Sequence, residues 1–252
     1  MPITKNVISR QLTGAGVALA NATGDPAIAE AVAAFGYNAA RLAQIHALLD
    51  AADAAVSEQV AATGAYRAAS AHTAAAESTA QGSYQGLSQV ARAALRDTPG
   101  ALATLGIEGP MPRTRPSFIT RALALLDNAV AKPDIAAALA GFGYTADKLA
   151  AERAKVQALI DAVQAQEAAK GEAQHATAAQ DAAMKVLNAE MSAFRRVAKV
   201  ALRGQPQLLE KLGILQRATR TEAQRHAGQK AAATREARKH ANAAPAEPVG
   251  VK

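Results

Sequence analysis

The tripeptide Phe35-Gly36-Tyr37 returns as Phe142-Gly143-Tyr144, 107 positions later in the chain, together with the residues around it. At this fixed offset, residues 12–107 align with residues 119–214 without a gap. The matched pairs include Pro26 and Pro133, Leu42 and Leu149, Gly64 and Gly171, Leu95 and Leu202, and Ile107 and Ile214. Self-similarity at a fixed period indicates that one structural unit has been repeated in tandem. We therefore interpret the chain as a tandem duplication.

The composition predicts an all-α protein whose core is thinly packed. Half of the 252 residues are hydrophobic, yet aromatic residues make up only 3% and Trp is absent. Much of the apolar content is alanine, which is the best helix former and buries little surface, so it favours helices that approach each other closely. The absence of Cys excludes disulfides, thiolate catalysis and Cys-ligated metal sites.

We interpret the Phe-Gly-Tyr motif as a corner between a short helix and a long one. Its glycine can adopt the left-handed conformation that ends a helix, and we expect its two aromatic residues to contribute local core. Asn38 and Thr145 directly follow the two copies of the motif, and both are good caps for a new helix. Upstream, Asp25 is placed to cap a short helix that Pro26 opens.

The segment that follows each corner decides the architecture. From Thr145 to Arg203 the chain contains no Pro and a single Gly, which favours one helix of about 59 residues. The alternative is a hairpin folded near Gly64 and Gly171, which would give three-helix units. Large apolar residues gather at both ends of each segment and alanine fills the middle, as two closely packed long helices require. We favour continuous antiparallel helices padded by short ones, in an elongated bundle.

Four regions follow from these patterns. Residues 5–107 and 116–214 form the two predicted helical repeats, and residues 108–115 form a linker rich in Gly and Pro. Residues 215–252 form a basic tail, which contains eight Lys or Arg against three Glu and, after Leu215, no Leu, Ile, Met, Phe or Tyr. Such a segment cannot bury enough apolar surface to fold alone, so we expect it to be largely disordered.

The first residues resemble a secretory signal, but the repeat argues against a cleaved segment. The apolar positions of residues 5–21 align with residues in the middle of the chain, where a signal peptide cannot lie. We therefore predict that residues 5–21 form the first helix, matched by residues 118–131. No apolar window is long enough to cross a membrane, and we expect a cytoplasmic protein without a transmembrane segment.

Glu172 and His175 are the only pair in the sequence with a metal-like spacing. Carboxylate-bridged bundles use Glu-x-x-His, but they need two such motifs and two further Glu residues. The matching positions of the first repeat hold Ala65 and Ala68. We therefore treat this pair as a weak candidate and expect neither a metal nor a cofactor. No Ser-His-Asp set, phosphate-binding glycine loop or zinc spacing occurs, so we predict that the protein is not an enzyme.

Basic residues suggest a binding surface near the end of the second repeat. Arg195, Lys199 and Arg203 recur every four residues, with Arg196 beside them. The simplest interpretation is that these cations complement a helix dipole, and the alternative is a phosphate-binding strip continuous with the tail. The candidate binding cations of the tail are Arg217, Arg220, Arg225, Lys230, Arg235, Arg238 and Lys239. Cationic arms bind polyanions without reading sequence, and no aromatic residue is interleaved here to stack on bases.

These observations favour a structural or binding role. The leading hypothesis is a helical scaffold whose basic tail adheres non-specifically to nucleic acid or another polyanion, with self-association as a further expected property. The second is an amphipathic helical protein that coats a lipid or storage-granule surface, because its interior is rich in alanine and weakly packed. The third is a metal-binding bundle centred on Glu172 and His175.

Overall fold

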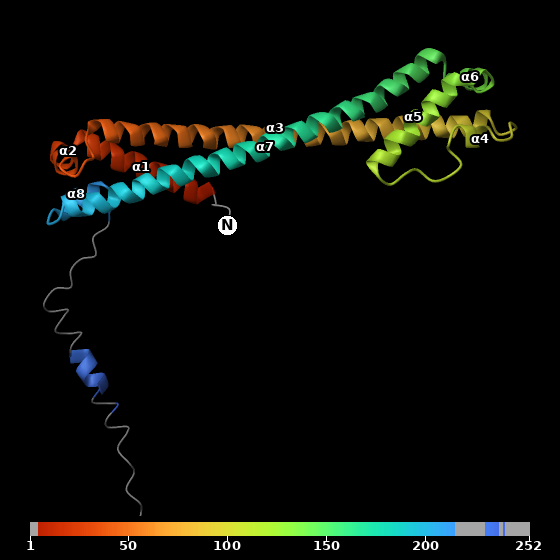
Figure 1. The fold of residues 1–252 in the computed structure, drawn as a ribbon. Coiled ribbons are helices and arrows are strands. Elements are labelled where there is room, and N and C mark those ends of the chain that lie inside the picture. Colours follow the sequence, from red (N-terminus) through yellow and green to blue (C-terminus); the bar gives the residue numbers. More distant parts are fainter. Residues whose placement is uncertain (1–4, 215–229, 237–238, 240–252) are drawn as a thin grey trace, which may run out of the picture. The chain divides into compact units, whose positions relative to one another are not determined.

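The computed structural model describes residues 5–214, 230–236 and 239 (Figure 1). Within these residues every regular element is a helix, which confirms the all-α prediction. In chain order the helices are α1 (Lys5–Gly24), α2 (Pro26–Ala33), α3 (Ala39–Ala94), α4 (Ala101–Thr104), α5 (Arg115–Ala131), α6 (Pro133–Ala140), α7 (Ala146–Ala201) and α8 (Pro206–Lys211). Residues 230–236 are helical as well.

Helices α3 and α7 are the two long elements, and each runs unbroken for 56 residues (Figure 1). Gly64 and Gly171 lie inside these helices, so the prediction of continuous helices is confirmed and the hairpin alternative is wrong. A single glycine in a helix costs only about 1 kcal/mol relative to alanine, which is too little to break a helix supported on both sides. The 107-residue offset relates the first and last residues of α3 to those of α7, and those of α2 to those of α6.

Short polar side chains begin the helices, as the sequence predicts. The Asp25 Oδ1 atom accepts a hydrogen bond from the Ala27 backbone N–H at 3.0 Å, and Pro26 occupies the first turn of α2. At the start of α3, the Asn38 Oδ1 atom accepts from the Arg41 N–H at 3.0 Å. Thr145 makes the corresponding, longer contact at the start of α7, at 3.4 Å. These caps satisfy backbone donors that have no partner inside the helix.

The two Phe-Gly-Tyr corners have nearly the same backbone. Gly36 and Gly143 have φ values of +87° and +86°, the left-handed region in which glycine meets no penalty. Tyr37 is buried, whereas Phe35 and Phe142 are 52% and 58% exposed. The expectation that both aromatic residues contribute core is therefore wrong for Phe. The phenylalanine precedes the glycine and stays on the outer side of the turn. The chain changes direction at the glycine, and this turn directs the following tyrosine inward.

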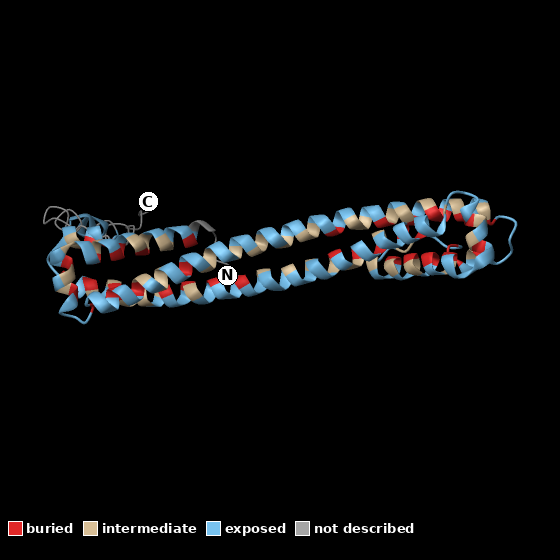
Figure 2. Cartoon of the chain, turned by 90° about the horizontal axis from the view of Figure 1, so that it is seen from above, coloured by how far each residue is buried: buried red, intermediate tan, exposed pale blue. Residues whose placement is uncertain are grey.

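The chain packs as two units, and each draws on both predicted repeats. Among the described residues up to 214, unit 1 comprises residues 5–13 and 43–192, and unit 2 comprises residues 14–42 and 193–214. Helices α1, α3 and α7 contribute to both units. Buried residues gather where short helices cover the long ones, and the middle of α3 and α7 is mostly exposed (Figure 2).

Each unit has an apolar core with an aromatic pair. In unit 1 the rings of Tyr84 and Phe118 meet edge to face, with centroids 5.7 Å apart. In unit 2 the rings of Tyr37 and Phe194 do the same at 5.3 Å. Such pairs contribute about 0.5–1.5 kcal/mol beyond the area that they bury. The first pair thus anchors α5 to α3, and the second anchors the corner after α2 to α7.

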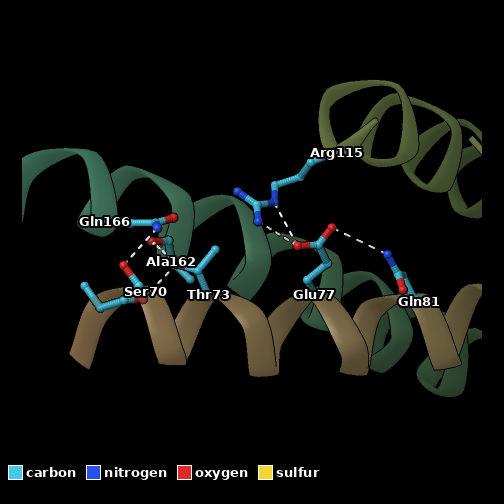
Figure 3. A network of polar contacts seen from close by, with 8 residues as sticks. Ser70, Thr73, Glu77, Gln81, Arg115, Ala162 and Gln166 are labelled. Atoms are coloured by element: carbon cyan, nitrogen blue, oxygen red, sulfur yellow. Dashed lines mark hydrogen bonds and ion pairs between the residues drawn. The ribbon is translucent and has the colours of Figure 1, made fainter. Parts of the chain in front are cut away.

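Within unit 1, α3 and α7 are also joined by polar contacts (Figure 3). The Gln166 Nε2 atom donates to the Ser70 Oγ atom at 3.0 Å, and the Thr73 Oγ1 atom donates to the Ala162 carbonyl at 3.0 Å. Farther along α3, the Ser83 hydroxyl donates to the buried Glu152 carboxylate. Contact positions rise along α3 as they fall along α7, so the helices are antiparallel. We call these contacts the polar seam.

The Glu152 carboxylate at the end of the seam stays ionised at neutral pH. Its side chain is 6% exposed, and the Lys155 Nζ atom lies 2.6 Å away. Burial alone would raise the pKa of Glu152, but the hydrogen bonds from Lys155 and Ser83, with the charges of Lys155 and Lys148, outweigh it and lower the pKa. Burial and the nearby Glu152 charge raise the pKa of Tyr144.

Candidate polyanion-binding surface

Positive charge is concentrated in unit 2 and in the tail. Residues 14–42 and 193–214 of unit 2 contain six Lys or Arg against three Asp or Glu. Residues 5–13 and 43–192 contain fourteen Lys or Arg against fifteen Asp or Glu. The tail adds eight basic residues against three acidic ones. Unit 1 is therefore slightly acidic, and unit 2 is basic.

The predicted basic strip lies in unit 2, at the end of α7. Arg195 and Lys199 occupy the last turns of the helix, whereas Arg203 lies in the turn that follows Ala201. Lys199 and Arg203 are exposed and Arg195 is half-buried. The Arg195 guanidinium lies over α1, where a β-carbon added at Gly14 would be 3.8 Å from its Nη2 atom. The strip is thus helical as far as Lys199 and continues on a turn.

The matching cations of the first repeat are engaged in the fold. Arg92 is the counterpart of Lys199, and its Nη2 atom donates to the Ile107 carbonyl at 2.5 Å. Arg96 is the counterpart of Arg203, and it pairs with Asp97 at 2.9 Å. The Ile107 carbonyl thus holds Arg92, and the Asp97 carboxylate offsets the charge of Arg96 in a pair that stays largely exposed.

In the second repeat the corresponding side chains are available. Gly204 stands where the first repeat has Asp97, so the carboxylate that would pair with Arg203 is missing. The side chains of Arg195, Lys199 and Arg203 make no hydrogen bond or ion pair with any residue between 5 and 214 whose side chain is described. Cations at a helix C-terminus also complement the dipole, which accounts for about 0.3–1 kcal/mol each. Their charge nevertheless remains accessible to a ligand.

Two other cations of unit 2 have structural roles. The Lys211 Nζ atom lies 2.8 Å from the Asp25 Oδ2 atom, and this hydrogen bond lowers the pKa of Asp25. The Arg41 guanidinium lies 4.8 Å from the centroid of the Tyr37 ring, a cation–π contact. We therefore exclude Lys211 and Arg41 from the binding surface. Arg196 is exposed, and it too has interactions within the fold.

An apolar side chain lies beside the cations of α7. Val200 is 59% exposed, and Arg196 precedes it by four residues, so the two are neighbours on the helix surface. Lys199 directly precedes it in the sequence, and Arg203 follows three positions later. The sequence interpretation did not include Val200, although a helical projection of residues 195–203 places it at the edge of the basic residues, next to Arg196. Val17 and Phe35 of unit 2 are also about half exposed, at 49% and 52%.

The structure describes only some of the predicted tail cations. Arg217, Arg220, Arg225 and Arg238 lie outside the described residues. Lys230 and Arg235 are exposed on the helical segment 230–236, where the Thr234 hydroxyl donates to the Lys230 carbonyl at 2.8 Å. Lys239 is exposed as well.

Glu172 and His175, the weak metal candidate, are exposed on α7. In the described part of the chain, no three His, Asp or Glu side chains are grouped so that they could hold a metal ion. The helices of that part include none with the length and apolar character needed to cross a bilayer.

Comparison of the chain with known proteins finds no match. No protein-family model matches the chain, and neither a curated protein nor a solved structure matches it.

Proposed function

We propose that this protein is a non-catalytic, cytoplasmic helical scaffold that adheres to nucleic acid or another polyanion without reading its sequence. In this proposal the scaffold arose by duplication of one helical unit, and the second copy became the binding one. The binding surface comprises Arg195, Lys199 and Arg203 of unit 2, with Arg196 at its edge, and it continues into the basic tail.

The observation that carries the proposal is the difference between matched cations in the two repeats. Arg92 donates to the Ile107 carbonyl and Arg96 has the Asp97 carboxylate beside it, whereas Lys199 and Arg203 have no such partner among the described residues. An unpaired exposed cation can contact a phosphate without first giving up an ion pair. Each such contact releases a counterion from the polyanion, which makes binding strongly salt-dependent.

A salt titration of duplex DNA binding tests this proposal. Log K should fall linearly with log salt, with a slope of about 0.9 for each phosphate that a cation contacts. Replacing Arg195, Lys199 and Arg203 together by Gln should reduce the slope by up to about 2.7. Replacing the seven basic residues of the tail from 217 to 239 by Gln should reduce it further.

A matched control removes the same charge from unit 1. Arg67, Lys132 and Lys185 are exposed, and changing all three to Gln lowers the net charge of the chain equally. This variant should keep the slope of the native chain. Absence of DNA binding at low salt, or an equal loss in the control, would reject the proposal.

A coat on an anionic lipid or storage-granule surface is the second candidate. Val200 favours it, because exposed apolar side chains next to cations are typical of proteins that lie on a charged membrane surface. Co-flotation with anionic vesicles would be reduced by Val200→Ser in this case, whereas DNA binding would not change. The third hypothesis, a metal-binding bundle, has no support in the described residues beyond Glu172 and His175.

A further inference from the structure

Unit 1 contains an open apolar groove between the C-terminal half of α5 and the first turns of α7. Its volume is about 340 Å³, and Leu126, Val130, Leu149 and Ala150 form its apolar lining. Asp127 and Arg153 also line it, and their side chains are 55% and 50% exposed, which places them at its edge. The groove therefore combines an apolar floor with one acidic and one basic side chain at the edge.

A large apolar side chain is exposed at this groove. Val130 is 57% exposed, although it lies in the last turn of a helix whose other apolar residues are mostly buried. With Leu126, Leu149 and Ala150 it gives the groove an apolar surface that Asp127 and Arg153 border. Exposed apolar surfaces that polar residues border in this way mark interaction sites.

The matching position of the first repeat has a different character. Thr23 stands in place of Val130, and its hydroxyl donates to the Leu19 carbonyl at 3.0 Å. Ala20 and His46 replace Asp127 and Arg153, so no ion pair can form there. The apolar side chain and the charged pair are therefore additions to a common scaffold, and helix packing does not require them.

The charged pair at the edge retains unused hydrogen-bonding capacity. The Arg153 Nε atom donates to the Asp127 Oδ1 atom at 2.9 Å. The Nη donors of Arg153 and the Oδ2 acceptor of Asp127 make no further contact with described side chains. A two-fold axis through the groove would place the Arg153 of one chain opposite the Asp127 of the other, and the reverse. Isologous interfaces are self-complementary in this way.

We propose that this groove is the interface of a homodimer. The occupant is the same surface of a second copy, whose Val130 side chain fills the groove while Asp127 and Arg153 pair across the two-fold axis. The apolar contact supplies the affinity, and the charged pairs select the copy over other partners.

Sedimentation equilibrium of the full-length chain tests the proposal over a range of concentrations. The native chain should form a dimer, and Val130→Asp should raise its dissociation constant at least tenfold. Val60→Asp is the matched control, because Val60 is 52% exposed in unit 1 and lies outside the groove. The control should dimerise like the native chain. Circular dichroism confirms that each variant remains helical.

Charge reversal tests the pairing itself. Asp127→Arg alone and Arg153→Asp alone place like charges across the axis, so each should weaken the dimer. The double variant restores opposite charges and should recover most of the lost affinity. A native chain that stays monomeric at all accessible concentrations would overturn the proposal. So would a dimer that is insensitive to Val130→Asp, or a double variant that is weaker than both single ones.

Discussion

The Thr73 hydroxyl on α3 donates to the Ala162 carbonyl on α7 at 3.0 Å and shares its proton with the Ala69 carbonyl of its own helix at 2.9 Å, from a side chain that is 1% exposed. Thr73→Val keeps the shape of the side chain and removes the donor. We expect this change to lower the free energy of unfolding by about 0.5–1.5 kcal/mol, the usual net value of such a bond. Urea unfolding followed by circular dichroism measures it.

Thr79→Val is the matched control for that change. The Thr79 hydroxyl is exposed and donates only within its own helix, to the Ala75 carbonyl. Its replacement should change stability by less than about 0.5 kcal/mol, as surface substitutions usually do. Equal losses in the two variants would show that the contact between α3 and α7 contributes nothing.

Replacing glycine by alanine should change the stability of the fold in opposite directions at two kinds of position. Gly64 and Gly171 lie within α3 and α7, and an added β-carbon would meet nothing within 4 Å. Each change to Ala should therefore raise stability by about 1 kcal/mol through helix propensity. Gly36 and Gly143 have positive φ, so Ala there should cost about 1–2 kcal/mol. Urea midpoints of the four variants give the signs, and a loss at Gly64 or Gly171 would contradict the expectation.

Glu152 should make stability depend on acid. Its pKa in the folded protein lies below the ordinary value of 4.5. The stabilisation is therefore complete above pH 4.5 and is lost as the pH falls through the folded pKa. Glu152→Gln should cost about 1–3 kcal/mol at pH 7, because it removes charged hydrogen bonds from Lys155 and Ser83. Unfolding curves from pH 7 to pH 3 should show the difference between the two proteins shrinking below pH 4.5.

Glu167→Gln is the control that separates the effect of Glu152 on stability from a general sensitivity of the protein to acid. Glu167 is 65% exposed and pairs with Lys170 at 3.2 Å on the surface of the same helix. Exposed pairs of this kind contribute little, so the variant should follow the native pH curve. If Glu152→Gln also followed the native curve, the buried carboxylate would have no special role.

Arg115 holds the start of α5 against α3 (Figure 3). Its Nε and Nη2 atoms donate to the Glu77 Oε2 atom at 2.9 and 2.7 Å. Lysine carries a similar charge but cannot present two donors in this fixed geometry. We expect Arg115→Lys to lower the free energy of unfolding by about 0.5–1 kcal/mol, and Arg113→Lys, in the preceding linker, to change it less. Urea unfolding compares the two, and equal effects would argue against a specific role for the pair.

Local chemistry explains which parts of the fold the sequence predicted. Asp25 and Asn38 cap helices with atoms from the same stretch of chain, and the Gly36 turn depends on its own backbone, so short patterns were sufficient. The outward direction of Phe35 was not predicted. It depends on which side of the corner packs against the rest of the protein, and its hydrophobicity alone suggested burial.

Part of the candidate site was also predicted, because it too depends on a local pattern. The spacing of Arg195 and Lys199 is visible in the sequence, and both lie on α7. Their lack of partners depends on residues that folding brings close, such as Gly204 in place of an aspartate. The groove of unit 1 was not predicted at all, because α5 and α7 become neighbours only in the folded protein.

The polar seam has a further consequence for how the two long helices find their alignment. Alanine faces look alike from one turn to the next, so α3 and α7 could slide past each other by about 5.4 Å with little change in apolar contact. A slip of one turn would separate Thr73 from Ala162 and leave the Glu152 carboxylate without the Ser83 hydroxyl. Polar groups buried without partners are costly, so the seam selects one alignment among many that the alanines would accept.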